Sequence, residues 1–186
     1  KGSSSRMNLL GRRISLDPPA VVEKLVRQGR GGWCFEQNLL LGEALRALGF
    51  DVTDLAGRVV WGRAPDAVVP RTHRLLLVRA EGGEWLADVG FGGQMLAGLL
   101  DLRSDLPQRD SHAQFRLSRS GSEHLLSTLV GDEWLPMYRF DEHPQQAVDF
   151  EAANFQLVHD PASHFTQRLV VSNLTAGGRH VMRGGE

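Results

Sequence analysis

The chain has 186 residues, of which 41% are hydrophobic and 23% charged, and its formal net charge is −1. This length fits one domain or two small compact units, and the composition excludes a disordered chain. A net charge near zero gives no electrostatic reason for a nucleic acid or an anionic membrane as a partner. No apolar run approaches the roughly 20 residues that span a bilayer.

The start of the chain, Lys1–Ser5, has no apolar stretch, and we interpret it as a cloning remnant or a ragged end rather than a signal peptide. A single cysteine cannot form an internal disulfide, so the protein does not depend on an oxidising compartment. We therefore expect a cytoplasmic protein whose one thiol is either buried filler or chemically reactive.

The first third of the chain carries helical signals. Asp17 followed by two prolines is typical of a helix start, because aspartate caps free N–H groups and proline in the first turn loses no hydrogen bond. We expect this helix to end at Gly29 and a second helix to run from Cys34 to Leu48. The second helix presents one stripe, made of Cys34, Asn38, Leu41, Leu45 and Leu48.

Beyond residue 51 the pattern changes to that of short β-strands. Six segments are rich in β-branched, aromatic or leucine residues: Val59–Trp61, Arg74–Arg79, Trp85–Val89, Gln114–Leu117, Leu125–Val130 and Trp134–Phe140. Strands at this spacing indicate an antiparallel sandwich or a small barrel. Gly82 and Gly83 predict a two-residue hairpin turn, which would place Asp88 opposite Leu77.

The last segment begins with a predicted helix near Glu151–Val158, which a break at Asp160 and Pro161 follows. Arg168–Ser172 and Arg179–Met182 then predict a hairpin. An isolated hairpin is only marginally stable, so we expect a sheet that has been cut short here.

Cys34 is the first candidate catalytic residue. It follows two glycines that allow a sharp turn into the helix, so its thiol lies in the first helical turn. The free N–H groups and the helix dipole there favour a thiolate and are placed to donate to an oxyanion; Arg30 adds to this effect and Glu36 opposes it. Asn38 argues against a purely apolar stripe, although a buried packing cysteine is the alternative.

A thiolate nucleophile needs a base, and the base needs an orienting acid. His73 precedes an apolar strand, and Asp88 lies among apolar residues where a carboxylate needs a partner. In the predicted register the two lie on one face but roughly 13 Å apart, so a bulge, a bend or another turn must join them. A surface histidine is the alternative for His73. The remaining histidines show no metal-ligand spacing.

Three motifs occur in order along the chain: RGGWCFEQN at 30–38, RTHRLLLV at 71–78 and DVGFGG at 88–93. Together they resemble the arylamine N-acetyltransferase family. The likeness covers nearly the whole chain, because it continues through Gly11–Asp17, Tyr138–Asp141, Asp149–Asn154 and His164–Val171.

The resemblance implies an α+β fold of the cysteine-proteinase-like kind in three parts. Residues 1–50 would form a helical domain with the nucleophile, and residues 51–148 an antiparallel β-barrel domain with the base and the acid. Residues 149–186 would form a linker helix and part of an α/β lid. Family members usually have several dozen residues before the segment at Gly11, and a longer lid after residue 186.

The resemblance also implies roles. Cys34 is the implied nucleophile, His73 the base and Asp88 the orienting carboxylate, as in papain-like and transglutaminase sites. Acetyl-coenzyme A is the implied acyl donor, with contacts at Thr72, Gly90, Gly92 and Trp61. The implied acceptor is a small arylamine or hydrazine near Phe91 and Phe165, and no metal is implied.

Three functions are open at this point. The first is acetyl transfer to an amine nitrogen through an acetyl-cysteine, as in xenobiotic metabolism. The second keeps the same three residues but acts as a thioester hydrolase or as an amide synthase that closes a macrolactam. The third is a catalytically silent binding protein.

Overall fold

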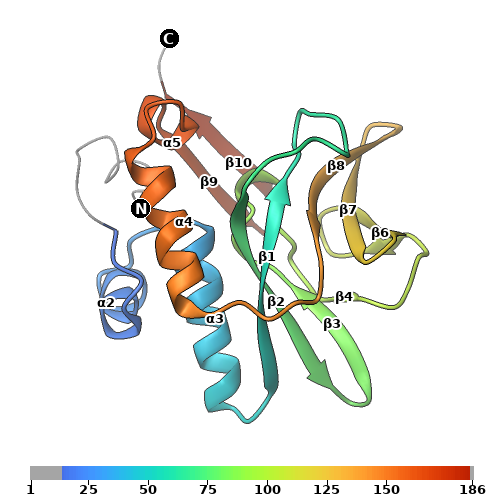
Figure 1. The fold of residues 1–186 in the computed structure, drawn as a ribbon, viewed down its shortest axis with the longest axis horizontal. Helices are drawn as coiled ribbons and strands as arrows, with labels where there is room; N and C mark the ends of the chain where they lie inside the picture. The colour runs from blue at the N-terminus through green and yellow to red at the C-terminus, as the bar shows by residue number, and fades with distance from the viewer. Residues whose placement is uncertain (1–13, 185–186) are drawn as a thin grey trace.

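The structure is a computed structural model that describes residues 14–184, apart from the side chain of His164. The start Lys1–Ser5 and the first three residues of the motif at Gly11–Asp17 lie outside the described residues. Figure 1 shows helices α2, α3 and α4 on one side of a curved β-sheet, with the strands β9 and β10 at one end.

The first helix is α2, Pro18–Val22, which continues as the π-helical turn η1, Glu23–Arg27. Asp17 caps it as predicted, because one of its carboxylate oxygens accepts from the N–H of Ala20 at 3.3 Å. The second helix, α3, spans Cys34–Ala47 and confirms the second prediction apart from one residue. Leu48, the last residue of the predicted stripe, lies just beyond α3 and is 75% exposed, whereas Leu45 in the last turn packs against the sheet.

Eight antiparallel strands form one sheet in the order β4-β3-β2-β1-β8-β7-β6-β5. The strands are β1 (Asp51–Val59), β2 (Arg71–Ala80), β3 (Gly83–Ala87), β4 (Leu100–Asp101), β5 (Gln108–Arg109), β6 (Gln114–Ser120), β7 (Glu123–Val130) and β8 (Glu133–Phe140). The sheet curls into a nearly closed barrel. Of the two predicted architectures, a sandwich and a small barrel, the barrel is confirmed, and so is the α+β class.

The strand predicted at Val59–Trp61 is wrong, because β1 ends at Val59 and begins eight residues earlier, at Asp51. Asp54, a polar residue in the middle of β1, masked the strand in the sequence. In the fold its carboxylate pairs with Arg46 at 2.5 Å and with Arg74 at 2.7 Å, so its charge is compensated beside the helices.

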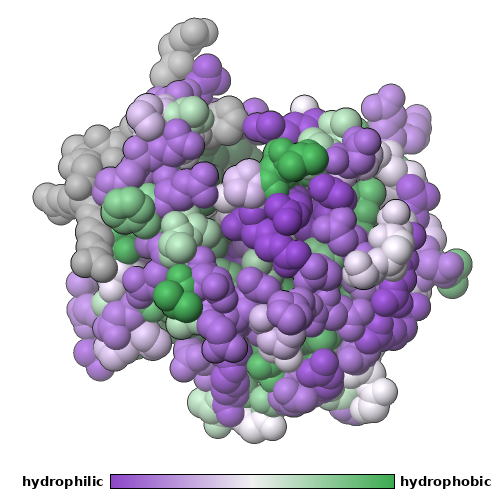
Figure 2. All heavy atoms as spheres, in the orientation of Figure 1, coloured by the Kyte–Doolittle hydropathy of each residue, from purple (hydrophilic) through white to green (hydrophobic). Residues whose placement is uncertain are grey.

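Two main clusters of apolar side chains hold the fold together. The first fills the barrel and includes Leu55, Leu75, Phe115 and Tyr138. The second joins the helices to the outer face of β1 and consists of Ile14, Trp33, Cys34, Phe35, Ala56 and Phe150. Because Cys34 belongs to the second cluster, the packing of α3 on the sheet brings the thiol to the strands. Outside these clusters the surface in Figure 2 is largely hydrophilic.

The last part of the chain contains α4 (Ala147–His159), α5 (His164–Gln167) and a hairpin of β9 (Val170–Thr175) and β10 (Gly178–Arg183). The predicted helix and hairpin are therefore confirmed, with shifted ends. The hairpin is not isolated, however, because Arg179 joins it to the barrel loop at Gly93 and Gln94. Among the described residues, no helix is long and apolar enough to cross a membrane.

Candidate active site

The turn between β2 and β3 lies one residue earlier than predicted. The two strands pair Ala80 with Gly83, so Glu81 and Gly82 form the two-residue turn. Both turn residues have positive φ angles, 51° for Glu81 and 74° for Gly82. Such a turn matches the right-handed twist of the strands, which explains why glutamate accepts this conformation here.

This shift of the turn solves the distance problem between the predicted base and acid. β3 ends at Ala87, so Asp88 follows the strand, and continuing the register places it near Leu75 rather than Leu77. His73 is then only two residues further along the same face. Its Nε2 lies 2.6 Å from Oδ2 of Asp88, and both side chains are buried.

Cys34, the first residue of α3, completes the group. Its thiol lies 3.7 Å from the carbonyl oxygen of Thr72, the residue before His73, and its interaction with the imidazole of His73 helps to raise the pKa of that ring. Because Nε2 of His73 faces Asp88, Nδ1 is the ring nitrogen available to the sulfur. The start of α3, strand β2 and the loop after β3 thus bring together Cys34, His73 and Asp88, the three residues predicted from the sequence.

The charges in this group stabilise one another. Burial lowers the pKa of His73, but the charge and hydrogen bond of Asp88 and the hydrogen bond with Cys34 outweigh burial and raise the pKa to about 10. Burial raises the pKa of Asp88, but His73, Asn38 and the N–H of Gly90 outweigh it and lower the pKa. The imidazole is therefore protonated at neutral pH, between a carboxylate and a sulfur.

Two further side chains hold Asp88 in place. Tyr138 donates its hydroxyl to Oδ2 at 2.9 Å, and Asn38 donates its amide to Oδ1 at 2.9 Å. Asn38 also donates to the carbonyl of Arg74 and accepts from the N–H of Val89, so it joins α3 to both flanking segments. Burial and the nearby negative charge of Asp88 raise the pKa of Tyr138, which keeps the phenol a donor.

Sequence reasoning noticed Asn38 as a polar residue on the stripe but missed Tyr138. Tyr138 lies on β8, far along the chain from the other members of the site, and only the pairing of β1 with β8 brings it near. Two signals were available: its position in a predicted strand, where a buried phenol needs a hydrogen-bond partner, and its place in the segment Tyr138–Asp141 that shares the family likeness.

Gly90 lies directly against the nucleophile. A Cβ atom added to it would be 2.5 Å from the Cα of Cys34 and 2.8 Å from Nδ2 of Asn38. The loop after β3 can approach the start of α3 this closely only because no side chain stands between them.

Glu36, two residues after the thiol, has a cation as its partner. Its carboxylate is buried, forms an ion pair with Lys24 and accepts from the N–H of Trp33 at 3.2 Å. The expectation that Glu36 opposes a thiolate at Cys34 stays a prediction, with a cation next to its carboxylate.

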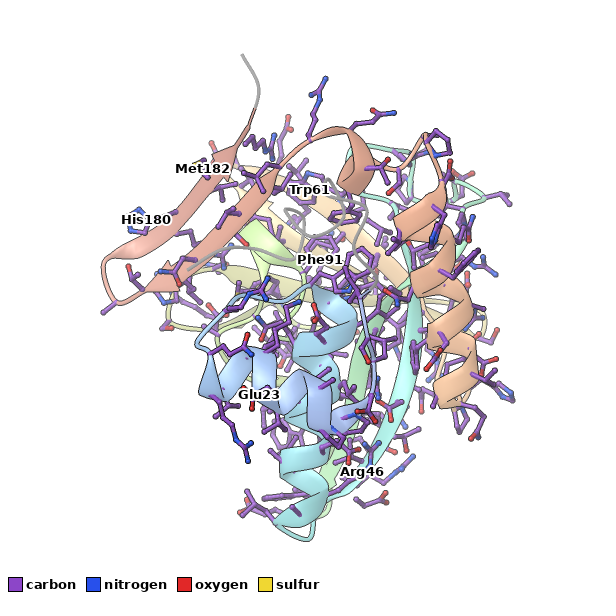
Figure 3. The ribbon with its side chains drawn as sticks, turned by 90° about the vertical axis from the view of Figure 1, so that its left-hand side faces the viewer. Glu23, Arg46, Trp61, Phe91, His180 and Met182 are labelled. Atoms are coloured by element: carbon purple, nitrogen blue, oxygen red, sulfur yellow. The ribbon has the colours of Figure 1, made fainter. Side chains whose placement is uncertain are left out.

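Aromatic rings form the wall next to the imidazole. The ring of Phe91 meets that of His73 edge to face at 5.3 Å between centroids and lies 6.3 Å from that of Trp61. Figure 3 shows Trp61 and Phe91 next to each other. Phe165 packs at 5.3 Å against Trp33, the residue before Cys34. Gly92 starts the short 3-10 turn η2, Gly92–Gln94, immediately after Phe91.

Among the side chains that the structure describes, no three from histidine, cysteine, aspartate or glutamate form a group that could hold a metal ion.

A family model described as "N-acetyltransferase" matches residues 6–186 of the chain. The arylamine N-acetyltransferase of Escherichia coli is 46% identical over 178 residues, which cover 96% of this chain. The chain belongs to the arylamine N-acetyltransferase family. It spans 61% of the length of the E. coli family member.

Solved structures of the arylamine N-acetyltransferase family have the same fold. The enzyme of Mycobacterium smegmatis is 41% identical, with a TM-score of 0.92 over 97% of this chain and 67% of its own. The Mycobacterium marinum family member, solved in complex with CoA, is 34% identical, with a TM-score of 0.92 over 96% of this chain and 68% of its own. These matches confirm the predicted family and fold class.

We expect Tyr138→Phe to weaken the fold and to lower the reactivity of Cys34. The change removes a buried hydrogen bond to a charged carboxylate, which is worth about 1.5–3 kcal/mol. The free energy of unfolding in urea should fall by about that amount, and the rate of Cys34 alkylation by iodoacetamide by up to about tenfold. Thr128→Val is the control, because it removes a partly buried hydrogen bond to the carbonyl of Gln114 on the same sheet. Equal effects of both variants on alkylation would contradict a role for Tyr138 in the site.

The second expectation concerns the protonation of His73. Nitrogen NMR should show an imidazolium that loses its proton near pH 10, and Cys34→Ala should lower that pKa because the sulfur helps to raise it. The pKa of His73 in the folded protein exceeds its ordinary value of 6.5, so protonation of His73 stabilises the fold. This stabilisation is complete at pH values below 6.5. This stabilisation should disappear as the pH rises through about 10. A neutral imidazole at pH 8 would show that the charge balance is different.

Proposed function

We propose that this chain transfers the acetyl group of acetyl-coenzyme A to the nitrogen of an arylamine, arylhydrazine or similar acceptor. The observation that carries the proposal is the buried pair of His73 and Asp88, 2.6 Å apart, beside the thiol of Cys34, which lies 3.7 Å from the carbonyl oxygen of Thr72 next to His73. The names of the related proteins support the choice of acceptor, and the M. marinum complex supports the choice of donor.

The first half-reaction moves the acetyl group onto the protein. The thiolate of Cys34 attacks the thioester carbon, and N–H groups at the start of α3 are the donors that we propose for the oxyanion that forms. As the tetrahedral intermediate collapses, the bond to the sulfur of coenzyme A breaks. The imidazolium of His73 gives its proton to this leaving thiolate, so coenzyme A departs as a thiol and His73 becomes neutral.

The second half-reaction moves the acetyl group to the amine. An aromatic amine is largely unprotonated at neutral pH, so its nitrogen attacks the acetyl-cysteine directly. The attacking nitrogen becomes acidic, and the neutral imidazole of His73 takes its proton, which contributes about 10²–10⁴-fold to the rate. The thiolate of Cys34 leaves, and the starting ion pair is restored. Asp88 keeps the ring oriented and stabilises the imidazolium in both steps.

We infer a division of labour among three parts of the chain. Residues 1–50 supply the nucleophile, residues 51–148 the base and the acid, and residues 149–186 a linker helix and part of a lid. For coenzyme A we propose contacts at Thr72, Gly90, Gly92 and Trp61, and for the acceptor contacts at Phe91 and Phe165. The free thiol of Cys34 needs a reducing compartment, which favours the cytoplasm.

The test is mass spectrometry of the intact protein after incubation with acetyl-coenzyme A alone. We expect an adduct of about 42 Da on Cys34, which disappears when an arylamine is added and an acetylated amine is formed. Cys34→Ala is the control and should show neither adduct nor product. Absence of the adduct in the wild-type chain would refute the proposal, and release of coenzyme A that needs no amine would indicate a hydrolase instead.

A further inference from the structure

The hairpin of β9 and β10 packs against the turn that follows Phe91. A Cβ atom added to Gly93 in this turn would be 2.9 Å from Cγ2 of Val181 on β10. A Cβ atom added to Gly92 would be 3.6 Å from Oγ of Ser172 on β9. In Figure 3, Phe91 lies on the barrel side of this contact, whereas His180 and Met182 lie on the hairpin. Both strands of the hairpin therefore touch the residues next to Phe91.

Arg179 on β10 is the polar link across this contact. Its guanidinium donates to the side-chain oxygen of Gln94 at 2.5 Å and to the carbonyl of Met95 at 3.2 Å. A third, longer hydrogen bond reaches the carbonyl of Gly93 at 3.4 Å. One planar guanidinium thus binds three consecutive residues, which a compact ammonium group cannot do in the same way.

The turn has little else to fix its shape. Gly92 has a left-handed φ of 71°, and Gly93 has no side chain to anchor it. The turn closes with a single backbone hydrogen bond, from the N–H of Met95 to the carbonyl of Gly92 at 3.2 Å. Glycine gives the backbone the most freedom, so contacts from outside have to select one conformation of this turn.

The position of this turn matters for the site, because Phe91 comes immediately before it. The ring of Phe91 meets the imidazole of His73 and lies near the ring of Trp61. A small flat amine makes most of its contacts with such rings, whereas a coenzyme with a long arm spreads its contacts over a larger surface. A displaced Phe91 should therefore affect the amine far more than the coenzyme.

We propose that Arg179 is a positioning residue that fixes the turn at 92–95, and with it the ring of Phe91, for binding of the amine acceptor. This inference rests on the proposed function for its choice of ligand. It makes the hairpin a determinant of which amines are accepted, although the hairpin contributes none of the three residues Cys34, His73 and Asp88.

The kinetic test compares Arg179→Met with Arg183→Met. Arg183 lies on the same strand, is exposed, and its side chain makes no hydrogen bond or ion pair with any residue that the structure describes, so it is a matched control. In a mechanism with two half-reactions, kcat/KM for the amine reports the second step and kcat/KM for acetyl-coenzyme A the first. Arg179→Met should lower kcat/KM for the amine about tenfold and leave kcat/KM for acetyl-coenzyme A within about twofold of the wild type. Arg179→Lys should fall between the wild type and Arg179→Met.

Amide hydrogen exchange tests the positioning step without any activity. In Arg179→Met the amides of residues 92–95 should exchange about tenfold faster than in the wild type, while those of β2 stay unchanged. Unchanged exchange, or equal losses in both kinetic constants, would overturn the proposal. A wild-type chain that forms no acetyl-cysteine would refute the proposed function, and hydrogen exchange would still decide whether Arg179 fixes the turn.

Discussion

Asp88→Asn is expected to lower the rate of acetyl transfer about 10²–10⁴-fold. The carboxylate of Asp88 accepts hydrogen bonds from His73, Tyr138, Asn38 and the N–H of Gly90. An asparagine side chain has one oxygen and one NH₂ group. Its NH₂ group must therefore point at donors, either those of His73 and Tyr138 or those of Asn38 and Gly90, and the hydrogen bonds on that side are lost. The pKa of His73 should fall from about 10, because the charge that raises it most is gone. The imidazole is then neutral and can turn to the wrong tautomer, and the thiol keeps its proton.

Three measurements separate this effect from simple unfolding. The rate of Cys34 alkylation by iodoacetamide at pH 7 should fall together with acetyl transfer, since both need the thiolate. Circular dichroism should show that the variant is folded. Asp132→Asn is the control, because Asp132 is exposed in the turn between β7 and β8. A folded Asp88→Asn chain with unchanged alkylation would show that the carboxylate does not hold the sulfur ionised.

The parts of this site that the sequence predicted share one property: local chemistry marks them. Cys34 follows two glycines at a helix start, and Asp88 is a charged residue in an apolar run, so each is conspicuous without any knowledge of its neighbours. Asp17 and the helix start that it caps belong to the same class. Local signals of this kind depend on a few adjacent residues, and here the tertiary structure agrees with them.

The parts that the sequence did not predict depend on register or on contacts between distant segments. Moving the turn from Gly82 and Gly83 to Glu81 and Gly82 changes which residues face each other, and the sequence favoured the pair of glycines. Tyr138 reaches Asp88 through the pairing of β8 with β1, and no short stretch of sequence contains that pairing.

Local sequence signals and long-range contacts both act at the start of α3. The helix offers a thiol and free N–H groups, but their value depends on where the helix stands relative to β2 and the loop after β3. Asn38 fixes that position, because it binds Arg74 on β2 as well as Asp88 and Val89 beyond β3. Gly90 sets the closest approach of the same surfaces. A catalytic distance is therefore controlled by a buried amide and by a missing side chain.

Gly90→Ala tests this control of distance most directly. The backbone of Gly90 lies outside the left-handed region, so alanine meets no conformational obstacle and the effect is steric alone. The new methyl group would lie 2.5 Å from the Cα of Cys34, which is main chain and cannot rotate away. The start of α3 or the loop must then move by about 1 Å, which at a reacting centre costs about 10²-fold in rate. The free energy of unfolding should fall by about 1–3 kcal/mol as well.

The measurement is acetyl transfer and urea unfolding of Gly90→Ala beside Gly98→Ala. Gly98 is the matched control, because a Cβ atom there would meet only the side chain of Asp110 at an ordinary 3.7 Å. Gly98→Ala should leave both quantities close to those of the wild type. Since acetyl transfer should fall more than stability can account for, a Gly90→Ala chain that is fully folded at 25 °C should still be slow. Wild-type rates in that variant would show that the loop yields without moving the sulfur, and that the close contact does not set the distance between Cys34 and His73.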